Sequence, residues 1–437
     1  MKFSIDKQSL DELNLLSKFG QDSVYYLFNQ VRTKGGARLL DRMFQNPLVQ
    51  HDEINERSGI FLYFQTKGVS FKFDATTVGD MHEYVDHATD TFRGFVFISL
   101  LTKKVLATLV RDERYKRAVQ GLQAVISTLN SCHDFLLQIP DAEHPYIDRV
   151  NAIRAAMNHK SIVELKNIDI YQSLSISTLA YYDHLLKGEL NKQMMDILSF
   201  IYEVDIYTAV SRIAEQNGFK YALALPKNAN VFEATNLRHP CVENAVGNNF
   251  HMSHDQNVIF LTGANMAGKS TLMKAIGINL YLAHMGFPVA ADVFKFSVRD
   301  GLYSSINVAD DIGLGYSHFY AEVIRVKQAA EATASGKSLL LLFDELFKGT
   351  NVKDAFDGTL AVTEAFSEYR ACLFVVSTHI IEVGASLRQR TNIQFAYMPT
   401  VVKQRRLQYT YKLKEGITED RQGMMIIKNE KILELLS

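Results

Sequence analysis

One stretch in the second half of the chain restricts the possible folds more than any other feature. It runs Gly263, Ala264, Asn265, Met266, Ala267, Gly268, Lys269, Ser270 and Thr271, and it fits the phosphate-loop pattern G-x-x-x-x-G-K-[ST]. Apolar residues at 258–261 predict a buried strand before it, and apolar residues at helical spacing over 271–280 predict a helix after it. Because the pattern requires this order of strand, loop and helix, we interpret the stretch as a binding loop for a nucleoside triphosphate.

The residue types in this loop suit phosphate chemistry. Gly263 and Gly268 let backbone N–H groups converge on an anion, and the start of the following helix adds partial positive charge. Lys269 is expected to reach the β- and γ-phosphates, and the Ser270 hydroxyl is expected to be a ligand of Mg²⁺. The alternative is a glycine turn that precedes Lys-Ser by chance, and the strand and helix on either side argue against it.

Two further strand ends carry residues suited to hydrolysis. The apolar run 339–343 is followed by Asp344 and Glu345, which is the Walker B arrangement. Asp344 is expected to hold Mg²⁺ through water, and Glu345 to orient or deprotonate the attacking water. The run 373–377 leads to His379, whose imidazole is expected to donate a hydrogen bond to the γ-phosphate. Either strand end alone has a structural alternative, and the phosphate loop favours the catalytic interpretation of both.

The composition is that of a globular protein without an overall charge that would select its partners. The chain has 437 residues, of which 47% are hydrophobic, so two or three domains with substantial cores are expected. A net charge of −1 gives no overall attraction to nucleic acid or to membranes. Three cysteines without disulfide or metal-site spacing fit a reducing compartment, and no apolar run is long enough to cross a bilayer. We expect a cytoplasmic protein with no membrane partner.

Proline placement and apolar periodicity divide the chain in two. Long stretches of the first part lack proline and place apolar residues three and four apart, between Pro47 and Pro140 and between Pro145 and Pro226. Later, strand-like runs alternate with helical segments, at 258–261, 339–343, 373–377 and 407–413. We therefore predict an α + α/β fold, with a long-helix domain over 1–225 and an α/β domain over 226–437.

Basic side chains are frequent in the predicted helical part. They include Lys34, Arg38, Arg42, Lys103, Lys104, Arg111, Arg114, Lys116 and Arg117. Such residues can line a groove for phosphates, but acidic residues such as Asp112 and Glu113 are interleaved with them. We interpret the basic residues as the solvated faces of long helices.

Together these residues resemble the MutS family of DNA mismatch-repair ATPases, whose nucleotide-binding domain belongs to the wider ABC class. Asn265 and Met266 before the final glycine and lysine are similar to the family's phosphate loop, and residues 310–322 resemble its signature segment. Residues 377–379 resemble the family's strand with the switch histidine. The resemblance also makes Phe250 and Tyr411 candidate adenine-stacking residues, with Tyr411 placed in a late strand. A weaker similarity extends back to about residue 20.

The resemblance implies a helical lever domain followed by an ABC-type P-loop ATPase domain that uses ATP and Mg²⁺. It implies a homodimer in which each ATP is held between the phosphate loop of one subunit and the Ser317 segment of the other. The implied function is ATP-gated DNA binding related to mismatch repair. Few residues precede the lever, and no Phe-x-Glu triplet lies outside the ATPase part. We therefore expect that the mismatch reader and the DNA clamp are missing and that no nuclease domain is appended. We also expect the protein to recognise the structure of the DNA rather than a mismatch.

The sequence departs from the family at three places in the predicted site. Ala267 replaces a usual glycine, Phe347 stands where a glycine is expected, and a short insertion separates Gly349 from Asp357. Two other functions stay open. A nucleotide-driven clamp or scaffold for protein partners would not bind DNA in a salt-sensitive way. A P-loop kinase of a small metabolite would need a phosphoacceptor, so hydrolysis without an acceptor would exclude it.

Overall fold

The computed structural model divides the chain into two compact units, which are described separately below. It describes residues 2–17, 20, 22–86, 96–99, 101–102, 104, 114–140, 142–169, 175–306, 318–403 and 406–418. The sheet unit comprises residues 1–28, 44–58 and 213–437, and the helical unit comprises residues 29–43 and 59–212.

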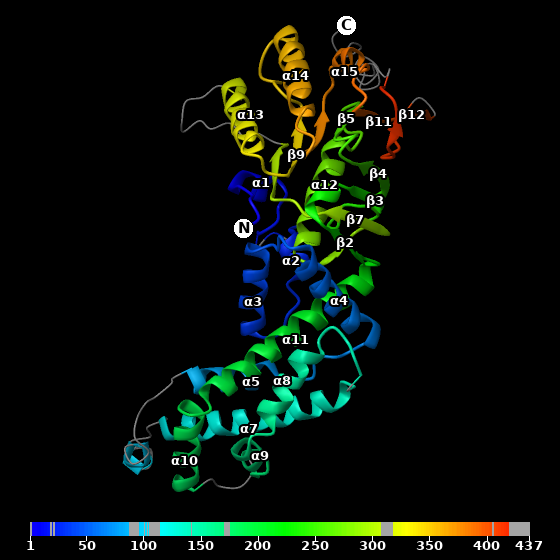
Figure 1. Cartoon of the computed structure of the whole chain (residues 1–437). Coiled ribbons are helices and arrows are strands. Elements are labelled where there is room, and N and C mark those ends of the chain that lie inside the picture. The colour runs from blue at the N-terminus through cyan, green and yellow to red at the C-terminus, as the bar shows by residue number, and fades with distance from the viewer. Residues whose placement is uncertain are drawn as a thin grey trace. The chain divides into compact units, whose positions relative to one another are not determined.

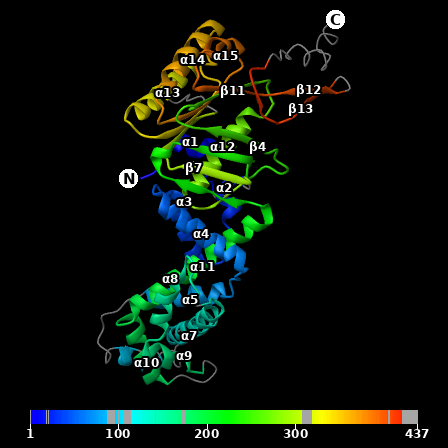
Figure 2. The same cartoon turned by 45° about the vertical axis from the view of Figure 1, so that its right-hand side comes forward.

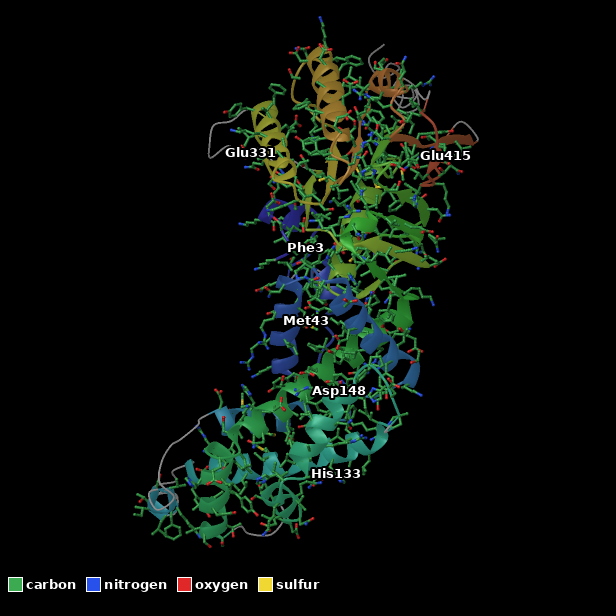
Figure 3. The ribbon with its side chains drawn as sticks, viewed as in Figure 1. Phe3, Met43, His133, Asp148, Glu331 and Glu415 are labelled. Carbon is green, nitrogen blue, oxygen red and sulfur yellow. The ribbon has the colours of Figure 1, made fainter. Side chains whose placement is uncertain are left out.

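The helical unit is built mainly from long helices that pack against one another. Its helices, some of which continue into the sheet unit, are α3 (Lys34–Gln45), α4 (His51–Lys67), α5 (Ala75–Asp86), α7 (Arg114–Gln138), α8 (Ile147–Met157), α9 (Lys160–Lys166), α10 (Ile176–Lys187) and α11 (Asn191–Asn217). Figure 3 labels His133 on α7 and Asp148 on α8. α7 packs against α5, α8, α9 and α10. The ring of Tyr146, the residue before α8, stacks on Phe200 and lies edge-on to Tyr207, so aromatic side chains join the start of α8 to α11.

A buried carboxylate fixes the start of α3. Asp205 accepts hydrogen bonds from the backbone N–H groups of Arg32 and Thr33 and from the Thr33 hydroxyl, so it caps N–H groups that would otherwise be unsatisfied. Only a glycine fits at position 35, because a Cβ there would lie 2.1 Å from the ring of Tyr202. The close approach explains the Gly-Gly pair after Lys34 in structural terms.

The sheet unit is centred on a six-stranded sheet with the order β14-β11-β5-β10-β9-β8. Its strands are β5 (Val258–Gly263), β8 (Gly301–Ser305), β9 (Leu339–Asp344), β10 (Leu373–Ser377), β11 (Ile393–Met398) and the short β14 (Lys414–Glu415). All neighbours are parallel except β11 and β14. Nearly all residues of the inner strands are buried, as continuous apolar runs predict for a parallel sheet covered on both faces.

Helices cover both faces of this sheet (Figure 1). They are α12 (Lys269–His284), α13 (His318–Ala334), α14 (Val352–Ser367) and α15 (Ile381–Leu387). Alternate strand residues such as Phe260 and Phe343 form one cluster with side chains of α13, α14 and α15. On the other face, Gly277 of α12 comes so close to Leu342 that an added Cβ would lie 2.9 Å from its Cδ1. The alternation of side chains along each strand thus separates two core layers.

Smaller elements surround the main sheet. A four-stranded sheet has the order β2-β7-β3-β4, β1 pairs with β6, and the β12–β13 hairpin extends away from the domain (Figure 2). The bounds are β1 (Lys220–Tyr221), β2 (Leu223–Leu225), β3 (Phe232–Leu237), β4 (Asn248–Met252), β6 (Pro288–Val289), β7 (Val293–Ser297), β12 (Thr400–Lys403) and β13 (Arg406–Tyr409). A short 3-10 helix, η1, spans Lys227–Ala229.

The N-terminal segment belongs to the sheet unit. It contains α1 (Lys7–Glu12) and α2 (Val24–Phe28). Ser4 bridges to Gly301 at the edge of β8, and Asp6 forms an ion pair with Arg325 of α13. Phe3, labelled in Figure 3, packs its ring against Tyr281 and His284 of α12. The first residues therefore complete the sheet edge on which α13 rests.

The structure confirms the mixed α and α/β fold class, and it corrects one predicted strand. The run 407–413 is a strand only as far as Tyr409, because Tyr411 has a positive φ of 53° that breaks the extended conformation. Residues 213–225, which the sequence analysis assigned to the helical domain, belong to the sheet unit, where β1 and β2 pair with β6 and β7. The predicted boundary between the two domains at residue 225 stays a prediction.

Within the part of the chain that the structure describes, no helix is both long and apolar enough to cross a membrane.

Candidate functional site

The candidate site lies where the parallel strands end. In the sheet register Ser377 is opposite both Asp344 and Leu261, and Gly263 is opposite Met398. The carboxyl ends of β5, β9, β10 and β11 therefore meet at one edge. Open parallel sheets bind ligands at this edge, where the strand order switches on either side of a central strand.

The loop after β5 has the backbone that its sequence predicts. Gly263 and Gly268 have φ values of 147° and 101°, which side-chain-bearing residues rarely adopt, and α12 begins at Lys269 directly after Gly268. Ala267, where a glycine was expected, is not among the described residues with positive φ, so its methyl group is tolerated. Met266 has a φ of 66° and is 76% exposed at the tip of the loop.

Lys269 folds back over the loop that precedes it. Its Nζ donates hydrogen bonds to the carbonyl oxygens of Gly263 at 3.0 Å and Ala264 at 3.2 Å. Burial lowers the pKa of the amine from its ordinary value, and the carboxylates of Asp344 and Glu345 act in the opposite direction. The ammonium group is thus held at the mouth of the loop by neutral carbonyl groups.

A hydrogen bond joins the start of α12 to the end of β9. The Ser270 hydroxyl, in the first turn of α12, donates to Oδ2 of Asp344 at the end of β9. The other carboxylate oxygen, Oδ1, is buried and has no hydrogen-bond partner within the described part of the chain. Two oxygen donors suited to a hard cation therefore lie together, and one carboxylate oxygen is still unpaired.

Glu345 and His379 form the other half of the site. Nε2 of His379 lies 2.5 Å from Oε1 of Glu345, and this hydrogen bond is the largest of the causes that hold the pKa of Glu345 below its ordinary value. The backbone N–H of Glu345 donates to the carbonyl oxygen of Ser377. Glu345 has a φ of 56°, so the chain turns sharply after Asp344. The carboxylates of Asp344 and Glu345 therefore point in different directions.

Strained backbone marks this region. Eight described residues other than glycine have positive φ values, and four of them are asparagines, which tolerate this conformation. The other four all belong to the candidate site or to segments beside it: Met266, Glu345, Phe347 and Tyr411. Unusual backbone conformations of this kind cluster at functional sites, where the surrounding structure maintains them.

A cavity of about 360 Å³ adjoins the start of α12. Its lining includes Gly268 and Thr271, the ring of Tyr411 and apolar side chains such as Val246. Tyr411 approaches the loop closely, because a Cβ on Gly268 would lie 3.0 Å from its Cδ1. Phe250 lies elsewhere: its ring stacks on Phe232, and it lines a separate cavity of about 780 Å³. The structure therefore brings Tyr411, but not Phe250, to the loop.

Some predicted positions are not placed, and others were missed. Ser317 and the other residues of the signature-like segment from 310 to 317 lie outside the described residues. The sequence analysis missed the stretch 242–248, which lines the cavity beside Gly268. Its position just after Pro240 indicates a loop, but nothing in the sequence alone connects this stretch to Tyr411.

Comparison with known proteins is consistent with this geometry. Residues 259–434 match the family described as MutS domain V, so the α/β domain that carries the site is of this class. The chain is 26% identical over 311 residues to the DNA mismatch repair protein MutS of Fusobacterium nucleatum, covering 65% of this chain and 33% of the relative. It is 26% identical over 242 residues to MutS of Lysinibacillus sphaericus (54% and 28%) and 25% identical over 279 residues to MutS of Petrotoga mobilis (63% and 33%).

The matched domain and these relatives support a MutS-family protein, in agreement with the sequence resemblance. The chain spans about a third of the length of these curated relatives.

Proposed function

We propose that this protein binds ATP with Mg²⁺ at the edge of the parallel sheet, hydrolyses it, and uses the cycle to gate DNA binding as a homodimer in the cytoplasm. The observation that carries the proposal is the Ser270–Asp344 hydrogen bond, which joins the phosphate-loop pattern to the Walker B strand. We assign the sheet unit to the ABC-type P-loop ATPases on this basis, and the helical unit to the family's lever domain.

The triphosphate is held by the loop and by Lys269. The N–H groups at the start of α12 and the two glycines provide an anion site, as in other phosphate loops. In this structure Lys269 donates to the carbonyl groups of Gly263 and Ala264, which are neutral acceptors. Charged phosphate oxygens make stronger charge-assisted hydrogen bonds, so the amine turns to the β- and γ-phosphates when ATP is bound.

The residues present fit a Mg²⁺ ion that is completed by phosphate oxygens and water. Ser270 and Asp344 would hold it, and the unpaired Oδ1 of Asp344 is an oxygen suited to accept a hydrogen bond from metal-bound water. Among the described residues, no three His, Cys, Asp or Glu side chains are grouped as a metal site of their own. Mg²⁺ in phosphoryl-transfer enzymes is commonly bound with few protein ligands, and it would neutralise charge on the transferred phosphate.

Glu345 serves as the group that orients or deprotonates the attacking water. Its lowered pKa keeps the carboxylate ionised at neutral pH, and the hydrogen bond to His379 fixes one of its two oxygens. The second oxygen is then available to water. That His379 donates to the γ-phosphate stays a prediction, and it requires the imidazole to leave Glu345 when ATP is bound.

The base is assigned to the cavity beside Gly268. Tyr411 lines this cavity and approaches Gly268 closely, which places an aromatic ring beside the phosphate loop. An aromatic face can stack on any purine, and such contacts are worth about 1–3 kcal/mol per base. Phe250 remains a candidate from the resemblance, but its ring stacks on that of Phe232.

DNA binding is proposed from the family, since the curated relatives are named DNA mismatch repair proteins. In the helical unit, Arg32, Lys34 and Arg38 line a cavity of about 460 Å³ together with Asp80 and Glu83, so the charge there is mixed. The alternative is a nucleotide-driven protein clamp without DNA contact. Binding to DNA that weakens steeply with salt supports the proposal, and binding that is absent at low salt favours the clamp.

One experiment tests the proposed function directly. ATP hydrolysis is measured with Mg²⁺ alone and then with matched duplex, mismatched duplex, single-stranded and branched DNA. We expect hydrolysis without any phosphoacceptor and stimulation by at least one form of DNA. Hydrolysis that depends on a small-molecule acceptor would contradict an ATPase, and rates unchanged by every DNA would contradict DNA-gated activity.

A further inference from the structure

The side-chain amide of Asn248 forms hydrogen bonds to the backbone on both sides of Lys412. Asn248, the first residue of β4, is 5% exposed. Its Nδ2 donates to the carbonyl oxygen of Tyr411 at 3.0 Å, and its Oδ1 accepts from the N–H of Leu413 at 2.7 Å. Next to it, Nζ of Lys412 donates to the carbonyl oxygen of Gly247 at 2.6 Å. Residues 247 and 248 therefore hold the segment 411–413.

This segment needs such support because Tyr411 is in the left-handed region. With a φ of 53° it has a conformation that costs a residue with a side chain about 1–2 kcal/mol relative to the right-handed one. β13 ends at Tyr409, and the segment does not continue as a strand. Hydrogen bonds from the Tyr411 carbonyl group and the Leu413 N–H to one buried amide define the direction of the chain at this point.

The placement of the backbone decides where the ring of Tyr411 lies. Tyr411 is 44% exposed, and its ring makes its close approach at Gly268, beside the cavity of about 360 Å³. An exposed ring on a strained segment would otherwise sample several positions. A ring that is held in place before the ligand arrives loses less conformational freedom on binding, which increases affinity.

We infer that Asn248 is a positioning residue for nucleotide-base recognition, which acts through Tyr411. The inference rests on the proposed function, since it assigns the base of ATP to this cavity. An amide is suited to the task because it provides one donor and one acceptor at the required places. A carboxylate of the same shape can only accept, so it would leave the Tyr411 carbonyl without its partner and place two acceptors together.

The test separates contacts with the base from contacts with the phosphates. Affinities of the full chain for ATP and for inorganic tripolyphosphate, both with Mg²⁺, are measured for the wild type, Asn248→Asp and Tyr411→Ala. We expect Asn248→Asp to weaken ATP binding about three- to tenfold and to leave tripolyphosphate binding within about twofold. In the Tyr411→Ala background, Asn248→Asp should cause little further loss, because its effect passes through the missing ring.

Two variants provide controls. Asn249→Asp makes the same chemical change at the next residue of β4, whose side chain is exposed and accepts a hydrogen bond from the N–H of Asn236, and it should leave ATP affinity unchanged. Lys412→Met removes the part-buried bond to Gly247 and is expected to fold even where Asn248→Asp does not. It should cause the same selective loss for ATP, to a smaller degree.

Three results would overturn the inference. Equal losses for ATP and tripolyphosphate would show that Asn248 acts on the phosphate loop or on the fold as a whole. Additive losses in the double variant would show that it does not act through Tyr411. If Tyr411→Ala weakens ATP binding but neither Asn248→Asp nor Lys412→Met does, the ring needs no positioning. If the wild type binds tripolyphosphate but not ATP, base recognition fails, whereas if it binds neither ligand, the proposed function itself fails.

Discussion

Glu345 and His379 lie side by side at the ends of adjacent parallel strands, with Oε1 of the carboxylate 2.5 Å from Nε2 of the imidazole. The two residues are far apart in the sequence and come from different strand ends. Their contact explains why the pKa of Glu345 is lowered although burial alone would raise it.

The first prediction follows from this contact. His379→Ala removes the hydrogen bond that lowers the pKa of Glu345, so that pKa should rise toward its ordinary value. The acid limb of the pH–rate profile for ATP hydrolysis should then move to higher pH, because the carboxylate becomes protonated earlier as the pH falls. His254→Ala, which removes an exposed imidazole beside Asp255, is the control. An unchanged acid limb would show that another group sets it.

The second prediction separates binding from hydrolysis. Lys269→Ala should lose ATP affinity because the phosphates lose their main cationic partner, whereas Glu345→Gln should bind ATP normally and hydrolyse it at least about a hundredfold more slowly. Equilibrium binding and single-turnover hydrolysis measure the two effects. Lys274→Ala removes the same charge from the same helix beyond the loop and should affect both much less. Near-normal turnover by Glu345→Gln would exclude Glu345 as the residue that orients the water.

The third prediction concerns the stability of the sheet unit in acid. His284 is fully buried, its Nδ1 bonds to the carbonyl oxygen of Leu48, and its Nε2 accepts from the N–H of Arg299, which requires a neutral ring. Burial lowers its pKa to about 4, whereas the ordinary value is 6.5. Between these values the unfolded chain binds a proton that the folded chain does not bind. The free energy of unfolding should therefore fall with decreasing pH, by up to about 1.4 kcal/mol per unit.

Denaturant unfolding at several pH values measures this dependence. His284→Gln removes the titrating group, so its free energy of unfolding should fall less steeply between about pH 6.5 and pH 4. The exposed His254 provides the control, since His254→Gln should retain the wild-type slope. If the slope of His284→Gln equals that of the wild type, His284 is not held neutral by its surroundings.

The fourth prediction asks which of two effects dominates at Phe347. Its φ of 62° favours glycine, and the family resemblance leads one to expect glycine there, but its ring is buried and approaches Gly358 closely. Removing a buried aromatic ring costs about 3–5 kcal/mol, whereas relief of a left-handed residue returns about 1–2 kcal/mol. Phe347→Gly should thus destabilise the protein by about 2 kcal/mol, and Phe347→Ala by about 1 kcal/mol more.

Unfolding free energies of the two variants isolate the backbone contribution, because both lack the ring. A glycine variant that is no more stable than the alanine variant would mean that the positive φ carries no strain. A glycine variant as stable as the wild type would mean that the ring contributes no more to stability than the relief of backbone strain returns.

The fifth prediction tests the shared site of the proposed homodimer. Ser317 lies outside the described residues, and the resemblance assigns it to the ATP of the partner subunit. Ser317→Arg and Glu345→Gln should each be nearly inactive alone. After mixing, about half the dimers contain one of each chain and have one intact site of two, so about a quarter of wild-type activity should return if the sites act independently.

Labelled subunits show whether exchange has occurred in that mixture. If exchange is complete and activity stays at the level of the two parents, Ser317 acts within its own chain or the two sites cannot act singly. The shared-site arrangement would then be wrong in its simple form.

Much of the candidate site was determined by the sequence alone, because the relevant constraints are local. Gly263 and Gly268 are needed where the backbone has φ values that other residues avoid, and Lys269 and Ser270 follow at once on the first turn of α12. The buried strand before the loop and the carboxylates at the end of β9 could likewise be predicted, since a continuous apolar run shows where a parallel strand lies and where it ends.

The tertiary structure alone decided which of these ends come together. Hydrogen bonding between distant strands sets the register, and that register brings Ser270 to Asp344 and Glu345 to His379. The amide of Asn248 forms hydrogen bonds with the Tyr411 carbonyl group and the Leu413 N–H, where the chain departs from its predicted strand. No local pattern encodes these contacts, because each depends on the packing of segments that are well separated along the chain.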